Sequence, residues 1–184
     1  MSDFTDYSGR FSPEFSSDTF NKDTLFALLK VYAAHMIRMD GLWYGTVMSK
    51  WGNEQALDCD VENMKRARPL EIEAICGLMN IRGNDVSTMM KAIQLSPWVR
   101  TLDFEMDVKN NNHARYLVRS CPTCFTLEKE GKGREGKICL DVCMLGMRIT
   151  ADRYNPDIKI TPLKVPPREN KNEPCCHWEF TLNR

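Results

Sequence analysis

Sulfur chemistry is concentrated in the C-terminal part of this chain, where six of its eight cysteines lie between residues 121 and 176. They fall into three groups: Cys121-Pro-Thr-Cys124, Cys139-Leu-Asp-Val-Cys143 and Cys175-Cys176-His177. The first group is a C-x2-C turn that can direct two thiolates at one ion, and the second places two sulfurs on one face of a helix. Zinc binds four such ligands in a tetrahedron, and iron–sulfur clusters also use four thiolates. The spacing therefore predicts a metal site. We expect zinc, with an iron–sulfur cluster as the alternative.

More ligands are present than one ion needs. The candidates are Cys121, Cys124, Cys139, Cys143, Cys176 and His177. The first four make one complete set, in which Cys176 could replace any member. Alternate residues of a strand face opposite sides, so Cys176 shares a face with Trp178 and Phe180 and is expected to point toward the core. His177 lies on the other face, where it is either a ligand or a surface histidine.

Other chemistry is open to the same residues. A C-x2-C pair can act as a thiol–disulfide centre, although that motif normally opens a helix within a βαβ unit, and the sequence shows none. A catalytic zinc would need a nearby acid or base, for which Asp141, Glu128 and His113 have suitable side chains. A single cysteine could also act as a nucleophile beside a histidine. The two remaining cysteines, Cys59 and Cys76, sit in helical patterns and are expected to behave as small hydrophobic residues.

The elements that must position these side chains change in character along the chain. Residues 1–20 form an aromatic N-terminal arm that is expected to dock on the body, and residues 21–184 form a single domain. Apolar residues with a period near 3.6 predict helices over 21–51, 53–66, 69–79 and 84–96. From residue 97 onward, alternating patterns predict strands over 102–108, 113–118, 158–165 and 176–182, with a polar loop over 128–137 and a short helix over 139–147. We therefore predict an α+β fold, with a helical half (21–96) packed on an antiparallel sheet that carries the cysteine cluster (97–184).

Composition excludes several classes of function. The 184 residues carry 25 basic and 25 acidic side chains, so there is no overall positive charge with which to bind nucleic acid. We find neither a basic and apolar leader at the N-terminus nor an apolar run long enough to cross a membrane. We therefore expect a cytoplasmic protein with reduced thiols, which favours metal binding over disulfides. Partners are expected to be limited to a small-molecule ligand, and the oligomeric state is not predicted.

A pocket for that ligand is one hypothesis for the helical half. His35, Asp40, Trp43 and Tyr44 fall within about three helical turns and could line a space between helices and sheet. The alternative is that the aromatic residues belong to the core and that Asp40 faces solvent.

Parts of both halves resemble an uncharacterised family of cytosolic proteins from anaerobic bacteria and archaea. In the helical half, the similar segments are Asp40-Gly-Leu-Trp43-Tyr and Gly52-Asn-Glu-Gln-Ala56-Leu. In the C-terminal half they are the Cys121-Pro-Thr-Cys124 turn, Ile138-Cys139-x3-Cys143, and Pro166-Pro167-Arg168 with Cys176-His177-Trp178-Glu179-Phe180. The match spans roughly Leu25 to Leu182.

More distantly, the chain is similar to 2-aminothiazoline-4-carboxylate hydrolases and to vinyl-reductase-type small-molecule-binding domains. The resemblance implies helices against an antiparallel sheet and a metal near Cys121, Cys124, Cys143 and Cys176. Our expectation is a cytosolic zinc-binding protein of unassigned activity that binds a small molecule. The alternatives are a hydrolase of a small cyclic amide- or amidine-like substrate, and an iron–sulfur or redox-sensing protein.

Overall fold

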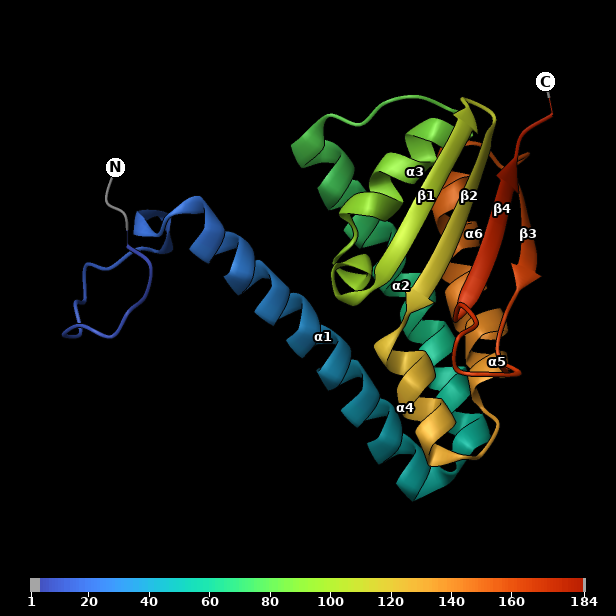
Figure 1. The fold of residues 1–184 in the computed structure, drawn as a ribbon, viewed down its shortest axis with the longest axis horizontal. Coiled ribbons are helices and arrows are strands. Elements are labelled where there is room, and N and C mark those ends of the chain that lie inside the picture. The colour runs from blue at the N-terminus through green and yellow to red at the C-terminus, as the bar shows by residue number, and fades with distance from the viewer. Residues whose placement is uncertain (1–3, 184) are drawn as a thin grey trace.

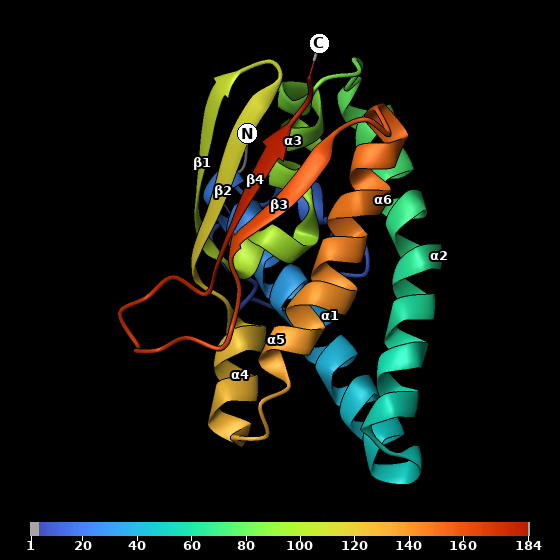
Figure 2. The same ribbon diagram turned by 90° about the vertical axis from the view of Figure 1, so that its right-hand side faces the viewer.

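The computed structural model describes residues 4–183 and has the predicted α+β architecture. Helices cover one face of a four-stranded antiparallel sheet whose strand order is β1-β2-β4-β3 (Figures 1 and 2). The helices are α1 (Lys22–Trp51), α2 (Asn53–Met79), α3 (Val86–Leu95), α4 (Pro122–Glu130), α5 (Glu135–Ile138) and α6 (Met144–Tyr154). The strands are β1 (Asp103–Asn110), β2 (His113–Ser120), β3 (Lys159–Lys164) and β4 (Cys176–Thr181). Shorter turns of helix are η1 (Ser17–Thr19), η2 (Pro97–Thr101) and the π-helical η3 (Cys139–Cys143).

Two long helices replace the three that the pattern predicts before residue 80. The separate helices expected over 53–66 and 69–79 are one continuous helix, α2, with Pro69 in its interior. An interior proline loses one backbone hydrogen bond and costs about 3 kcal/mol. Arg68 and Ile72 beside it are only 7% and 2% exposed, so tertiary packing on both sides of Pro69 holds the helix together.

A single residue, Gly52, joins α1 to α2. It serves as the C-cap of the first helix and the N-cap of the second, with φ of 96°. Residues that carry a side chain rarely adopt this backbone conformation, and a Cβ at this position would lie 3.1 Å from Oε1 of Gln55. The reversal between the two longest helices therefore depends on glycine.

The sheet follows the predicted alternation closely. Strands β1 and β2 form a hairpin in which Met106 lies opposite Tyr116. Arg119 pairs with Glu105 across the hairpin at 2.7 Å. Next to β2, strand β4 is antiparallel and places Cys176 opposite Val118. This register brings the end of β2 beside the start of β4.

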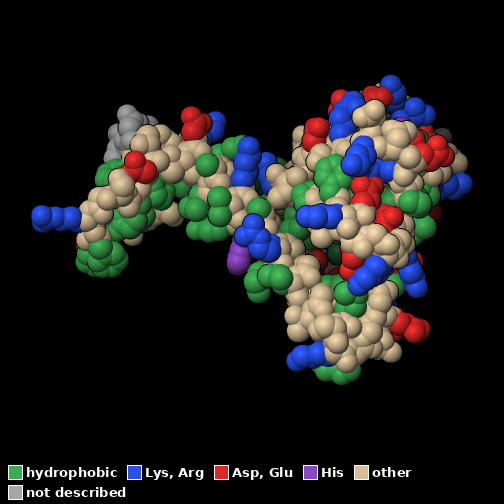
Figure 3. All heavy atoms as spheres, turned by 60° about the horizontal axis from the view of Figure 1, so that its bottom comes forward, with side chains coloured by type: hydrophobic (Ala, Val, Ile, Leu, Met, Phe, Trp, Pro, Cys, Tyr) green, Lys and Arg blue, Asp and Glu red, His purple; other side chains and the backbone are tan. Residues whose placement is uncertain are grey.

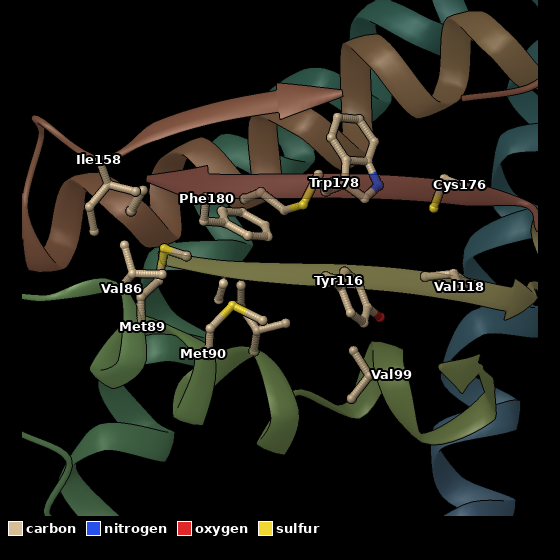
Figure 4. Close-up of a cluster of buried hydrophobic side chains, with 14 of the residues drawn as sticks. Val86, Met89, Met90, Val99, Tyr116, Val118, Ile158, Cys176, Trp178 and Phe180 are labelled. Carbon is tan, nitrogen blue, oxygen red and sulfur yellow. The ribbon is translucent and has the colours of Figure 1, made fainter. Parts of the chain in front are cut away.

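The main core lies between the sheet and helices α3 and α6. Trp178 and Phe180 on β4 are 1% and 0% exposed, and they pack with Met89 of α3 and Ile158 (Figure 4). The buried side chains of β4 alternate with partly exposed ones, which confirms the predicted inward face of Cys176, Trp178 and Phe180.

A buried polar network ties α2 to α6 and to the start of η2. Arg68 pairs with Glu71 at 2.6 Å and donates hydrogen bonds to Thr150 at 2.9 Å and Ser96 at 3.0 Å. Trp98 donates from its indole nitrogen to Glu71 at 3.2 Å. Every polar side chain in this network has a hydrogen-bond partner, which is the condition under which buried charge is tolerated.

Two local predictions are wrong. Half of the segment expected as a polar loop over 128–137 is helical, because α4 runs to Glu130 and ends at Gly131 in the left-handed conformation. The N-terminal arm, of which residues 1–3 lie outside the described residues, packs on itself at the far end of α1 and not on the body (Figure 1). Phe15 lies at the centre of this arm and contacts the rings of Phe4, Tyr7 and Phe20. Aromatic rings can satisfy one another locally, and the sequence does not distinguish this from docking.

Candidate functional site

Four thiols from three separate segments meet on the inner side of the sheet. Cys121 follows β2 and caps α4, Cys139 and Cys143 begin and end η3, and Cys176 is the first residue of β4. The thiol of Cys139 is hydrogen-bonded to those of Cys143 and Cys176. Cys121 is close enough to Cys143 and Cys176 for their charges to act on it. We call Cys121, Cys139, Cys143 and Cys176 the four-thiol cluster.

The π-helical turn explains how one short segment supplies two of these thiols. Its closing hydrogen bond runs from the backbone N–H of Met144 to the carbonyl of Cys139, one residue further than in an α-helix. Such turns are rare and are found mostly at functional sites. The sequence predicts an ordinary helix here, and its spacing gives no sign of the extra residue.

The cluster runs from the core to the surface. Cys176 is 8% exposed, Cys121 and Cys139 are half-buried, and Cys143 is exposed. Burial raises the pKa of Cys121 to about 12. Hydrogen bonding with Cys143 and Cys176, together with burial, raises the pKa of Cys139. The bond from Cys139 lowers the pKa of Cys176, which is therefore the sulfur best able to carry negative charge.

A buried tyrosine lies within range of the charges of the same sulfurs. Tyr116 on β2 is 5% exposed, and its hydroxyl has no hydrogen-bond partner. Burial raises its pKa, followed by the charges of Cys176, Cys121 and Cys143. Figure 4 shows Tyr116 and Cys176 on the neighbouring strands β2 and β4. Buried hydroxyls without a partner are uncommon, and an ion or water at the site is one usual explanation.

The arrangement of the thiols differs from a finished metal cage. Within residues 4–183, no group of three or more His, Cys, Asp or Glu side chains is placed so that it could hold a metal ion as it stands. Cys139 is instead hydrogen-bonded to Cys143 and Cys176, and the sulfur of Cys121 accepts from the backbone N–H of Cys124 at 3.5 Å.

Two further cysteines lie beside the cluster, and Cys175 is close enough to Cys121 and Cys176 for their charges to act on one another. Cys124 and Cys175 are 4% and 1% exposed, and their thiols are hydrogen-bonded to each other. Burial raises the pKa of both. The sulfur of Cys124 also donates to Glu128 at 3.5 Å, and Glu128 pairs with Arg168 at 2.6 Å. Cys124, a candidate ligand from the C-x2-C turn, is thus directed away from Cys121.

The other candidates do not join the cluster. His177 lies on the opposite face of β4, half-exposed between the buried Cys176 and Trp178. His113 is hydrogen-bonded to Glu179 at 3.0 Å on that same outer face. Of the proposed acids and bases, only Glu128 touches a cysteine, through Cys124.

The pocket expected from His35, Asp40, Trp43 and Tyr44 does not form. His35 and Trp43 are exposed, whereas Tyr44 is buried and donates to Asn53 at 2.9 Å. Asp40 instead lies near Asp60 of α2. Burial and then the charge of Asp40 raise the pKa of Asp60 to about 6.

A small open hollow lies near the Cys124–Cys175 pair. It has a volume of about 240 Å³ and is bordered by α4, α5 and the loop before β4. Glu135 contributes a buried carboxylate oxygen without a hydrogen-bond partner. The lining side chains carry both signs of charge: Glu128, Glu135, Pro167, Arg168, Glu169, Asn170 and Lys171.

Sequence reasoning missed Tyr116 and Asp60. Tyr116 belongs to an alternating strand, so its inward face could be read from parity, but its proximity to Cys176 depends on the register between β2 and β4. Asp60 lies within a charged helical segment, and only the crossing of α1 over α2 distinguishes it from the exposed Asp58.

Comparison with known proteins gives one result. Neither the curated proteins nor the solved structures include a match to this chain. Within the described residues, no helix has the length and apolar character needed to cross a membrane. A family model described as a family of unknown function, DUF6125, matches residues 18–182. That match covers both the helical half and the cysteine-rich sheet, and the chain therefore belongs to the family of unknown function DUF6125.

Proposed function

We propose that this protein binds a zinc ion through Cys121, Cys139, Cys143 and Cys176. The observation that carries the proposal is the convergence of these four thiols from the end of β2, the π-helical turn and the start of β4. Zinc takes four thiolates in its closed, structural sites. Chain segments that are distant in sequence and meet through sulfur alone are typical of such sites.

The surroundings support this choice of four from the seven available side chains. Cys124 and Cys175 are directed at each other, and His177 is on the far face of the sheet. The hydroxyl of Tyr116 has no hydrogen-bond partner and lies within range of the charges of Cys176, Cys121 and Cys143, so a bound ion with its thiolates would place an acceptor near it.

Zinc binding would replace thiol protons with one shared cation. Neutral thiols donate hydrogen bonds to one another, as Cys139 does, whereas thiolates repel and must share a positive charge. Zinc–sulfur distances are about 2.3 Å, so binding requires rotations about the Cα–Cβ bonds of side chains that already adjoin. We place this protein in a reducing compartment such as the cytoplasm, where the thiols stay available.

The role that follows is structural. A zinc ion with four protein ligands has no open position for substrate. It would fix η3 to the end of β2 and the start of β4, which are neighbouring central strands, and so hold α6 against the sheet. Binding free energy would then appear as folding free energy of the C-terminal half.

The test is elemental analysis with an absorption spectrum of protein purified anaerobically. We expect one zinc per chain and no visible colour. Cys139→Ser and Cys176→Ser should each lower zinc affinity at least 10-fold, whereas Cys59→Ser, on an exposed face of α2, should not. Metal-free protein, or equal zinc retention in Cys139→Ser, would refute the proposal. Iron with sulfide and visible colour would assign an iron–sulfur cluster to the same thiols.

A further inference from the structure

Helix α1 is attached to the body on one side only. Its buried side chains are Ala33, Tyr44 and Val47, and the last two pack with Ala56 of α2. The N-terminal end of the helix extends away from the sheet and carries the aromatic arm with it (Figure 1). In the space-filling view, apolar side chains are visible along this projecting segment (Figure 3).

A second apolar stripe runs along the same helix. It consists of Leu25, Leu29, Tyr32, Met36, Met39 and Trp43, which we call the α1 seam. The steps between members are four, three, four, three and four residues, the 3.5-residue repeat of a coiled-coil interface. At 100° per residue, the seam is centred roughly 70° around the helix from the stripe of Ala33, Tyr44 and Val47. The seam is therefore distinct from the face that packs on the body.

The seam is open to solvent. Leu29, Tyr32 and Met39 are 57%, 60% and 53% exposed, and Trp43 is 42% exposed. Leu25 and Met36 are partly buried. The half-exposed side chains leave about 100 Å² each and the two partly buried ones about half as much, or about 500 Å² together. That is already a large patch for a monomer, and two such patches bury about 1,000 Å², the area that a specific interface requires.

We propose that the α1 seam pairs with the seam of a second copy in an antiparallel homodimer. A seam with a regular 3.5-residue repeat is self-complementary, and a two-fold axis places the same surface on both subunits. With the axis at residue 34, Leu25 lies opposite Trp43, and Leu29 lies opposite Met39. At the centre, Tyr32 of each helix lies opposite Met36 of the other.

The antiparallel direction follows from where the bodies lie. Most of the body adjoins the C-terminal half of α1, with Arg100 of η2 also reaching Phe26 near the other end, so parallel pairing would bring two bodies to one end (Figure 1). Antiparallel pairing separates them and carries each aromatic arm past residue 43 of its partner. There the arm, whose Phe11 is 82% exposed, would contact the partner's Trp51, which is 63% exposed. This pairing gives the described part of the arm, which stands apart from its own body in Figure 1, a surface to contact.

The test is the mass of the full chain in solution, by light scattering and sedimentation, at concentrations from about 1 to 100 μM. We expect the wild type to be a dimer. Leu29→Glu and Met39→Lys should each weaken dimerisation at least 10-fold, because a charge is then buried opposite an apolar side chain. The double variant Leu29→Glu/Met39→Lys should restore the dimer, because each Glu then faces a Lys. In a parallel dimer, like charges would face one another.

Leu78→Glu is the matched control, since Leu78 on α2 is 85% exposed and lies outside the seam. It should leave the dimer unchanged, and circular dichroism should show the same helix content in every variant. A wild type that stays monomeric at 100 μM would overturn the proposal, including one that instead binds anionic lipid vesicles. A dimer that survives Leu29→Glu, or a double variant that stays monomeric, would overturn the antiparallel seam.

Discussion

The thiol of Cys139 in the π-helical turn is hydrogen-bonded to the thiol of Cys176 at the start of β4. This contact joins the helical layer to the sheet through sulfur. It also makes Cys139 the donor and Cys176 the acceptor, so the two cysteines have opposite shifts in pKa. Any ligand of the cluster must replace this bond.

Zinc is therefore expected to stabilise the wild type against urea. A ligand that binds only the folded state adds about 2.7 kcal/mol to the free energy of unfolding when its free concentration is 100 times the dissociation constant. Unfolding curves with buffered zinc and with chelator measure the difference. Cys139→Ser should show little difference between the two conditions, and a zinc effect of equal size in that variant would place the ion elsewhere.

Tyr116→Phe tests the unpaired hydroxyl. In chelator, removing a buried hydroxyl that has no partner should leave stability unchanged or raise it by about 1–3 kcal/mol. With zinc bound, the gain in stability of Tyr116→Phe over the wild type should shrink, because the wild-type hydroxyl then has an acceptor. Tyr154→Phe is the comparison, since its hydroxyl is 2.8 Å from the sulfur of Cys76, and losing that bond should cost about 1 kcal/mol. Equal behaviour of the two variants in urea would contradict the assignment.

Arg68→Ala should be strongly destabilising. It removes the positive charge that pairs with the buried Glu71 and the donor to Ser96 and Thr150, a loss of about 3–5 kcal/mol. Lys65→Ala removes an ion pair of the same spacing on the same helix, with Glu62, but both side chains are more than half exposed. Its cost should be below about 1 kcal/mol, and denaturant midpoints report both values.

Asp60 makes stability depend on pH. Its carboxyl has a pKa of about 6 in the folded protein, against about 4 in the unfolded chain. The folded state therefore binds more protons between these values, and the free energy of unfolding falls as pH rises through 6. Asp60→Asn should abolish this loss, giving a gain of about 3 kcal/mol at pH 7 relative to pH 4. Asp58→Asn, at an exposed position, should follow the wild type; a parallel pH profile for Asp60→Asn would be inconsistent with a buried carboxyl.

The sequence predicts elements better than it predicts contacts. Alternation is a local property, and it correctly identifies the strands and the inward face of Cys176. The single helix through Pro69 is missed because its stability comes from distant packing of Arg68 and Ile72. In the sequence, Pro69 indicates a helix boundary because those distant contacts cannot be seen there.

For the cysteines too, the sequence predicts the segments that carry them but not which sulfurs are in contact. Spacing groups Cys121 with Cys124, yet the structure pairs Cys124 with Cys175 and leaves Cys121 near Cys143 and Cys176. The sulfur of Cys121 caps the helix on which Cys124 lies, whereas the sulfur of Cys124 is hydrogen-bonded to Cys175 and Glu128. Which sulfur meets which depends on the register of β2 with β4, and that register is a long-range property.

Because Gly52 joins α1 to α2, a small change of angle at this residue moves the distant N-terminal end of α1 by a large amount. Thirty residues of helix span about 45 Å. If the helix pivots at this one residue by about 10°, its N-terminal end swings through about 8 Å. Gly52 thus sets the reach and aim of the aromatic arm from the opposite end of the molecule. Replacing this glycine would redirect the arm without altering a single residue in it.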